Sequence, residues 1–156
     1  MKEFSVVSVN SLALSNSVGF VHGAQKRMQK SILVIDANKK QCRELCEILE
    51  KGRFKTTPLY SSDNLQERIE ETECQAVFWD IDTVSMDNLT IRGLTIKFPD
   101  VYFFCLSSRP FHPELRDAIC YHIFACITRP INTDELFYWL KNIHEDEIGA
   151  EHKGNT

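Results

Sequence analysis

From residue 31 onward, apolar and polar positions follow two alternating patterns. Uninterrupted apolar runs occur at residues 32–35, 76–79, 101–106 and 124–127, and such runs are typical of strands that are buried on both faces. A further strand is predicted over residues 54–60, where Pro58 suits a position at the edge of a sheet. The runs therefore predict five strands.

Between these runs, apolar residues recur at helical spacing. Asn38 is predicted to cap a helix that ends at Gly52, and Ser62 or Asp63 to cap a second helix through residue 69. Further helices are predicted over residues 89–98, 113–121 and 133–143. Strict alternation of strands and helices predicts an α/β fold: a doubly wound, five-stranded parallel sheet with right-handed crossovers and helices on both faces.

One domain is expected from a length of 156 residues. Residues 1–29 show no clear periodicity and are predicted to form a flexible extension before a domain over residues 30–146. The polar residues 147–156 are predicted to form a disordered tail. The start does not have the pattern of a secretory signal, because Glu3 follows Lys2 and Ser or Asn interrupts every apolar stretch.

Charge and cysteine content narrow the classes of partner and location. The net charge is −4 and the chain has no basic stripe, which argues against nucleic acid as the main partner. No segment approaches the length of a transmembrane helix, so no membrane contact is expected. The six cysteines form no CxxC pair and accompany no His pair at zinc-finger spacing. We therefore expect them to be small buried hydrophobes in a reducing cytoplasm.

Polar residues stand at the ends of the predicted strands. Asp36 follows the first strand, Asp80 the third, Ser107 the fourth and Arg129 the fifth. Because the carboxyl ends of parallel strands lie on one edge of a sheet, these residues are expected to converge around Asp80, where open α/β sheets bind their ligands. The group combines carboxylates, a hydroxyl and a cation.

Four segments, in this order and spacing, resemble the CheY-like receiver domain of two-component response regulators. Residues 32–36 resemble the first strand with its acidic pocket, and residues 77–81 the phosphoacceptor strand. Residues 98–108 resemble the fourth strand with its hydroxyl, and residues 128–136 the segment with the family's lysine and cis-proline. The resemblance covers about residues 30–143 and implies a flavodoxin-like strand order of 2-1-3-4-5.

The resemblance implies a role for each residue of this group. Asp80 would accept a phosphoryl group from a histidine kinase or phosphotransfer protein. Asp36, Asp80 and Asp82, the last through its backbone carbonyl, would bind Mg²⁺. Ser107 would donate its hydroxyl to the phosphoryl group, and Arg129 would supply positive charge. Such a domain catalyses at most its own phosphorylation and dephosphorylation, and signals to a downstream protein.

Three positions depart from the family pattern. Ala37 stands where a second acid is usual, so Mg²⁺ is expected to bind weakly. Arg129 replaces a lysine, and its planar fork is not equivalent to an ammonium group. Cys126 replaces a Tyr or Phe that rotates during signalling. The Arg129–Pro130 peptide is still expected to be cis.

Other interpretations remain open. The chain could be a pseudo-receiver that keeps the fold as a protein-interaction module, with Arg129 paired to Asp80 in an unphosphorylated site. Asp36 could simply cap the following helix, and Ser107 could be an ordinary loop hydroxyl. Residues 80–84 also resemble the first motif of haloacid-dehalogenase-type phosphatases, although that family's nucleophile normally opens the fold.

The last predicted helix suggests an interaction surface. Its sheet-facing positions are already supplied by three aliphatic residues, so Phe137 and Tyr138 are predicted to point partly outward. In receivers the face of the fourth and fifth helices and the fifth strand is used for dimers and targets. We therefore predict a protein interface there, with a homodimer as one possibility.

Overall fold

The computed structural model describes residues 31–110 and 112–153. The predicted flexible extension over residues 1–29 lies outside the described residues. Five parallel strands form one sheet in the order β2-β1-β3-β4-β5, as predicted. The strands are β1 (Ser31–Ile35), β2 (Lys55–Leu59), β3 (Ala76–Asp80), β4 (Tyr102–Ser107) and β5 (Ala125–Thr128).

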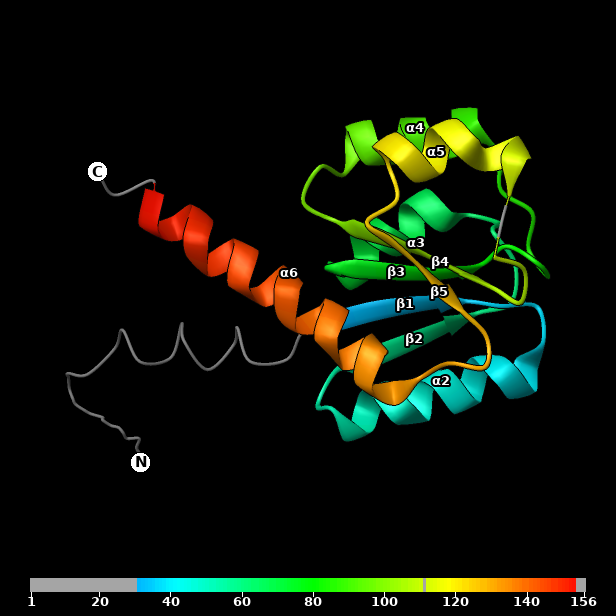
Figure 1. Ribbon diagram of the computed structural model, residues 1–156, viewed down its shortest axis with the longest axis horizontal. Helices are drawn as coiled ribbons and strands as arrows, with labels where there is room; N and C mark the ends of the chain where they lie inside the picture. Colours follow the sequence, from blue (N-terminus) through cyan, green and yellow to red (C-terminus); the bar gives the residue numbers. More distant parts are fainter. Residues whose placement is uncertain (1–30, 111, 154–156) are drawn as a thin grey trace. The chain divides into compact units, whose positions relative to one another are not determined.

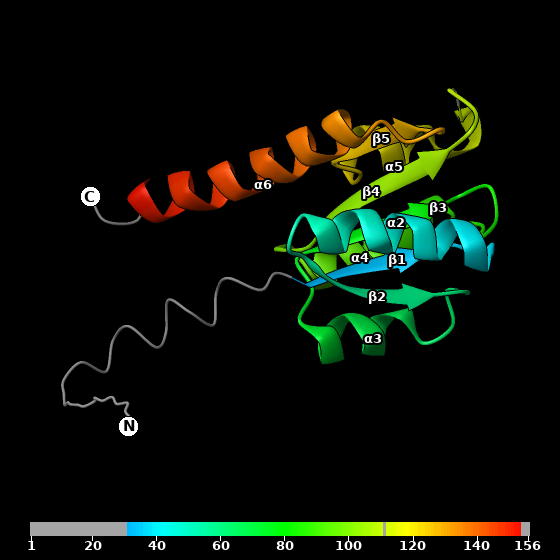
Figure 2. The ribbon, with the colours of Figure 1, turned by 90° about the horizontal axis from the view of Figure 1, so that it is seen from below.

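Helices cover both faces of the sheet (Figures 1 and 2). On one face lie α2 (Lys39–Lys51) and α6 (Thr133–Lys153), and on the other lie α3 (Leu65–Thr72), α4 (Asn88–Lys97) and α5 (Arg116–Tyr121). A 3₁₀ turn, η1 (Pro113–Leu115), precedes α5 directly, where a single helix over residues 113–121 was predicted. These layers confirm the doubly wound α/β fold.

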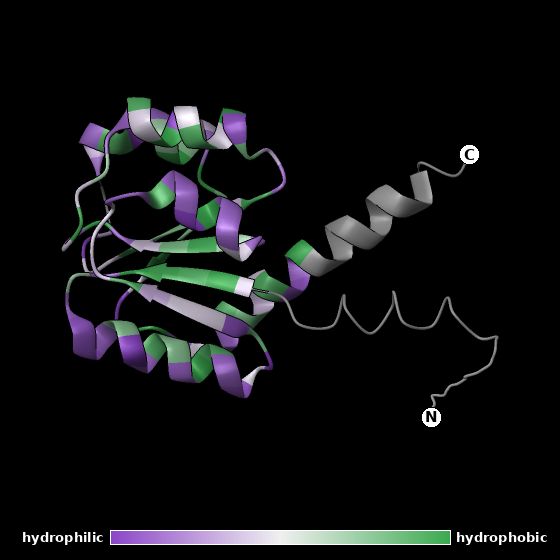
Figure 3. Cartoon of the chain, turned by 180° about the vertical axis from the view of Figure 1, so that it is seen from behind, coloured by the Kyte–Doolittle hydropathy of each residue, from purple (hydrophilic) through white to green (hydrophobic). Residues whose placement is uncertain are grey.

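Alternate residues of the central strands supply two hydrophobic cores. Phe78 and Phe104 stack at 4.5 Å between ring centroids in the core under α2 and α6, while Trp79 lies in the core under α3 and α4. All five residues of β3 are buried, and Figure 3 shows green, hydrophobic strands at the centre of the sheet between helices that carry both purple and green residues. Burial of each large apolar side chain contributes about 1.5–3 kcal/mol, so β3 is held firmly at the centre of the sheet.

Two helix starts show where local chemistry was predictable and where it was not. Asn38 caps α2 as predicted, since its side chain accepts a hydrogen bond from the backbone N–H of Gln41 at 3.1 Å. The predicted cap of the next helix, Ser62 or Asp63, is wrong. Instead α3 begins after Asn64, whose φ of 56° is left-handed and whose side chain makes no capping bond. Asn tolerates this conformation better than most residues, which allows the chain to turn there.

The last helix is longer than its apolar pattern. Its sheet-facing residues Leu136, Leu140 and Ile143 are buried as predicted, but α6 continues to Lys153, into the segment predicted to be a disordered tail. The prediction relied on apolar periodicity, which stops at Ile143. The following residues include several good helix formers and no proline, so intrinsic propensity favours continuation of the helix.

The exposure of the cysteines differs from the prediction in two cases. Four are buried, whereas Cys120 and Cys126 are exposed. No helix within residues 31–110 and 112–153 combines the length and the apolar character needed to cross a membrane.

Candidate functional site

The carboxyl edge of the sheet positions the predicted site residues. Asp80 is the last residue of β3, and Asp36 follows β1 directly. Both side chains are buried, with 1% and 0% of their surface exposed. Arg129 follows β5, and its backbone N–H donates to the carbonyl of Ser107 at 2.8 Å. The topology thus brings together residues from three strands, as the sequence predicted.

Arg129 forms ion pairs with both buried carboxylates. Its Nε donates to Oδ2 of Asp80 at 2.8 Å, and its Nη2 donates to Oδ2 of Asp36 at 2.9 Å. The side chain of Arg129 is itself only 16% exposed. A planar fork of donors suits two separate acceptors in a way that a lysine ammonium does not.

Thr83 completes this group, and its role was not predicted. Its hydroxyl lies 3.0 Å from Oδ1 of Asp36 and 3.2 Å from Oδ1 of Asp80, and it accepts the backbone N–H of Ala37 at 3.0 Å. A hydroxyl has one proton, so it can donate fully to only one of the two carboxylates at a time. We call Asp36, Asp80, Thr83 and Arg129 the arginine cluster.

Both carboxylates of the arginine cluster also accept backbone hydrogen bonds. Oδ1 of Asp80 accepts the N–H groups of Asp82 and Thr83, each at 3.0 Å, and Oδ1 of Asp36 accepts the N–H of Asn38 at 2.8 Å. Burial still raises the pKa of Asp36, with the Asp80 charge adding to it, although the Asn38 N–H, Thr83 and Arg129 oppose the rise. The alternative role of Asp36 as the cap of the following helix is wrong, because Asn38 is the cap of α2 and Asp36 only accepts the backbone N–H of Asn38.

A second group lies beside the first and is centred on another carboxylate. The carboxylate of Asp82 accepts hydrogen bonds from the Ser107 hydroxyl at 2.8 Å, the Ser108 N–H at 2.7 Å and the Ser108 hydroxyl at 2.9 Å. Burial alone would raise the pKa of Asp82, but these hydrogen bonds outweigh it and the pKa is lowered. We call Asp82, Ser107 and Ser108 the serine cluster. The Ser107 hydroxyl therefore donates to Asp82, whereas it was predicted to donate to a phosphoryl group on Asp80.

The donors present do not fit Mg²⁺ well. The ion prefers several oxygen ligands in octahedral geometry, but Arg129 already occupies one oxygen of Asp36 and one of Asp80. The Asp82 carboxylate is committed to the two serines. Among the residues that the structure describes, no three His, Cys, Asp or Glu side chains are grouped so that they could hold a metal ion. The predicted metal role of Asp36, Asp80 and the backbone carbonyl of Asp82 stays a prediction. The contacts of Asp36 and Asp80 with Arg129 argue against it.

Two further predictions concern the neighbourhood of the site. The Arg129–Pro130 peptide is cis, as predicted. On α6, Tyr138 is 59% exposed, whereas Phe137 is partly buried against the core under α2 and lies over Gly52, where an added Cβ would be 2.3 Å from its ring. Tyr138 is therefore the better candidate for a contact residue.

Trp79 connects the site to the core. Its indole N–H donates to the carbonyl of Val84 at 2.9 Å, and Val84 N–H in turn donates to the carbonyl of Asp80 at 3.1 Å. These bonds fix the turn over residues 80–84 against the sheet. The positions of Thr83 and Asp82 follow from this turn.

Comparison with known proteins identifies the fold. No protein-family model matches the sequence, and no match is found among the curated proteins. The structure is similar to a CheY-like response regulator receiver domain protein from Methanospirillum hungatei, with a TM-score of 0.68 and 17% identity over 78% of this chain and 98% of that chain. It is also similar to the signal receiver domain of a DNA binding response regulator from Colwellia psychrerythraea (TM-score 0.64, 19% identity, 75% of this chain and 99% of that chain). A two-component response regulator from Clostridium difficile gives a TM-score of 0.66 and 19% identity over 75% and 97% of the two chains.

The sheet topology and the residues at its carboxyl edge define a class of protein, namely doubly wound α/β domains with a buried pair of acids. Within that class, the chain has the CheY-like receiver fold of response regulators.

Proposed function

We propose that this chain is a pseudo-receiver: a signalling module with the receiver fold that acts through protein contacts and does not depend on phosphorylation of Asp80. The observation that supports the proposal is the Arg129 guanidinium, which pairs with Asp80 and Asp36 at once. The fold is typical of signalling domains, and the cluster at its edge resembles a structural ion pair more than an open reaction site.

The physical argument concerns what a phosphoryl donor would have to displace. Phosphoryl transfer needs a carboxylate oxygen in line with the phosphorus and positive charge around the three equatorial oxygens. Both oxygens of Asp80 already accept hydrogen bonds, from Arg129 on one side and from backbone N–H groups on the other. Withdrawing Arg129 from the site to free Oδ2 would leave both buried carboxylates without their cation, and breaking such a pair typically costs about 3–5 kcal/mol.

A second candidate function is the phosphoacceptor role itself. It is favoured by the same cation, because a guanidinium 2.8 Å from Asp80 could rotate to neutralise a phosphoryl group. In that case the partner is a histidine kinase or a phosphotransfer protein, and Ser107 would have to leave Asp82 for the phosphoryl group.

Acetyl phosphate with Mg²⁺, followed by intact mass measurement, separates the two functions. We expect the wild-type chain to gain no phosphoryl group. The double variant Ala37→Asp/Arg129→Lys supplies the missing carboxylate and a cation without the planar fork, so it should gain one. Adding Asp80→Asn to the double variant should abolish that gain.

One outcome of this experiment would contradict the proposal. A phosphoryl group on the wild-type chain that is lost in Asp80→Asn alone would establish the phosphoacceptor function instead. Urea unfolding of each variant shows whether it is folded, so a negative result from an unfolded variant is recognised.

We further propose that the exposed side of α6 contacts another protein or a second copy of this chain. Tyr138 is 59% exposed on this helix, and aromatic side chains are enriched in interfaces. Tyr138→Glu should weaken self-association in sedimentation velocity without altering the unfolding midpoint.

Tyr60→Glu is the matched control for this test. Tyr60 is also exposed, at 37%, but it follows the edge strand β2, at the opposite side of the sheet from β5. If both variants, or neither, change the sedimentation behaviour, α6 is not a specific surface for self-association.

A further inference from the structure

Two cysteines face each other across neighbouring strands. Cys105 of β4 is the direct register partner of Cys126 of β5. Adjacent strands lie about 4.8 Å apart, and disulfides join residues whose Cα atoms are about 4.4–6.8 Å apart. The backbone therefore already holds this pair at a separation that a disulfide can span.

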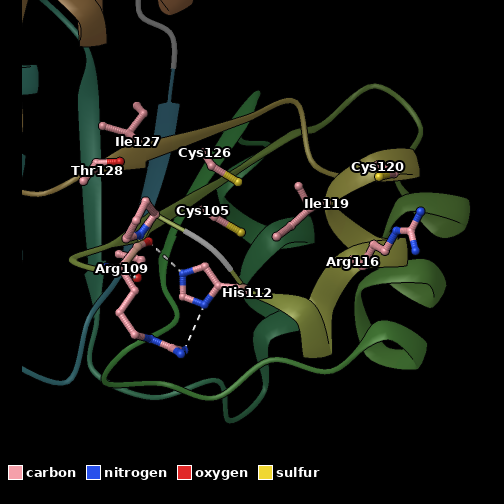
Figure 4. A pocket seen from close by; sticks show the side chains of 11 residues that line it. Cys105, Arg109, His112, Arg116, Ile119, Cys120, Cys126, Ile127 and Thr128 are labelled. Carbon is pink, nitrogen blue, oxygen red and sulfur yellow. Dashed lines mark hydrogen bonds between the residues drawn. The ribbon is translucent and has the colours of Figure 1, made fainter.

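The two thiols line one cavity but differ in access to solvent. The cavity, of about 490 Å³, lies beside β4, β5 and α5, and in Figure 4 the sulfurs of Cys105 and Cys126 point the same way, toward Ile119. Cys126 is exposed, whereas Cys105 is only 1% exposed. A small oxidant can therefore reach Cys126 first and leave Cys105 as the second thiol.

The surroundings favour a thiolate on Cys126. Interaction with the thiol of Cys105 lowers the pKa of Cys126 and raises that of Cys105. Arg109 and Arg116 also line this cavity, although Arg109 pairs with Glu114. A thiolate beside a protonated thiol is the arrangement in which one sulfur reacts and the other resolves the product.

A second thiol pair in the molecule lacks this access. Cys42 and Cys46, on α2, show the same division, with the pKa of Cys42 raised and that of Cys46 lowered by their mutual hydrogen bond. Both are buried in the core under α2 and α6, and Cys42 donates to the carbonyl of Val34 at 3.5 Å. The two thiol pairs therefore differ chiefly in the access of an oxidant from solvent.

We propose that Cys105 and Cys126 form an oxidisable pair that hydroperoxides convert to an intramolecular disulfide. The Cys126 thiolate attacks one oxygen of the hydroperoxide, so that a sulfur–oxygen bond forms, the oxygen–oxygen bond breaks and an alcohol or water leaves after taking up a proton. The Cys105 sulfur then attacks the sulfenic acid, so that the disulfide forms and the hydroxide leaves as water with the Cys105 proton. Two thiols are oxidised and one peroxide is reduced.

This disulfide would bind β5 covalently to β4 just before the edge site. Two positions further along these strands, Ser107 pairs with Thr128. The backbone N–H of the next residue, Arg129, donates to the carbonyl of Ser107. Oxidation would therefore restrict the strand that positions Arg129. The inference does not rest on the proposed pseudo-receiver function, since the thiols do not touch the acidic pair.

The test uses the full chain, hydrogen peroxide and intact mass measurement without reductant. The wild type should lose two hydrogen atoms, and peptide mapping after alkylation of free thiols should link Cys105 to Cys126. Cys126→Ser should abolish the loss, whereas the double variant Cys42→Ser/Cys46→Ser should keep it in full. Cys105→Ala should stop the reaction at a sulfenic acid on Cys126, detected as a dimedone adduct.

Mapping of the wild-type protein decides the matter even if a core variant fails to fold. A link from Cys126 to Cys120, which lines the same cavity from α5, would overturn the proposal. So would a link between Cys42 and Cys46, or a Cys126 that stays reduced under conditions where free glutathione is fully oxidised.

Discussion

The arginine cluster and the serine cluster hold carboxylates of neighbouring residues in opposite ways. In the arginine cluster, Asp36 and Asp80 are buried and share one guanidinium. In the serine cluster, Asp82 is exposed and receives only neutral donors from Ser107 and Ser108. A buried charge needs a counter-charge, because its desolvation is costly, whereas an exposed charge needs only well-placed hydrogen bonds.

This difference explains why a cation stands at position 129 and cannot easily leave it. Water cannot take the place of Arg129 at two buried carboxylates. The main role of the arginine is therefore structural. The serine cluster, in contrast, can open at little cost, because water can replace the serine donors at an exposed carboxylate. If the edge of the sheet changes conformation, the serine cluster is the part that moves.

Removal of the cation should have the largest effect. Arg129→Met leaves two buried carboxylates unpaired, so we expect a loss of about 3–5 kcal/mol in the free energy of unfolding, measured in urea. Arg109→Met is the matched control, because Arg109 is 58% exposed and pairs with an exposed Glu114. It should cost about 0–1 kcal/mol. Similar losses in the two variants would remove the distinction between a structural and a surface arginine.

Opening the serine cluster should have a smaller effect. Asp82→Ala removes the acceptor of three hydrogen bonds at an exposed site, so we expect a loss of about 1 kcal/mol by urea unfolding. The hydroxyl of the exposed Ser108 can then turn to water, whereas Ser107 is buried. A loss as large as that of Arg129→Met would mean that the two clusters act as one unit, and a double variant would then show strong non-additivity.

The smallest expected effect is a difference in pH dependence. The pKa of Asp36 is raised above its ordinary 3.8, chiefly by burial, so the folded state holds this proton more tightly and stability falls as the pH rises through the interval above 3.8. The pKa of Asp82 is lowered from the same ordinary value, so its contribution is present above 3.8 and is lost as the pH falls below it.

Urea unfolding between about pH 3 and pH 7 measures these slopes. Asp36→Asn should gain stability relative to wild type as the pH rises above 3.8. The deficit of Asp82→Ala should shrink as the pH falls below that value. Parallel curves for the wild type and both variants would show that neither carboxylate titrates as its surroundings imply.

The sequence predicted the edge of the sheet better than the contacts made there. The strand order was implied by the resemblance to receiver domains, and the convergence of Asp36, Asp80 and Arg129 follows from the geometry of parallel strands. The structure confirms both. Thr83 was missed because its role depends on the turn after β3, which has no periodic signal. The orientation of the Asp82 side chain was equally unpredictable, because it depends on which nearby hydrogen-bond donors the carboxylate accepts from.

The helices show the same contrast: the spacing of apolar residues predicts their buried faces, but not where each helix begins and ends. The buried faces of α2 and α6 were predictable from apolar spacing. The start of α3 and the end of α6 were not, because a left-handed Asn64 and the propensity of polar residues decided them instead.

The two tryptophans give the molecule a built-in optical readout of its two faces. Trp79 is fixed by its bond to the carbonyl of Val84, in the core under α3 and α4, whereas Trp139 packs edge-on against Phe124 at 5.8 Å on the α6 side. Replacing either one by Phe leaves a single fluorophore, so emission would report separately on the turn over residues 80–84 and on the helix proposed as a contact surface. The protein can therefore be followed without any attached label.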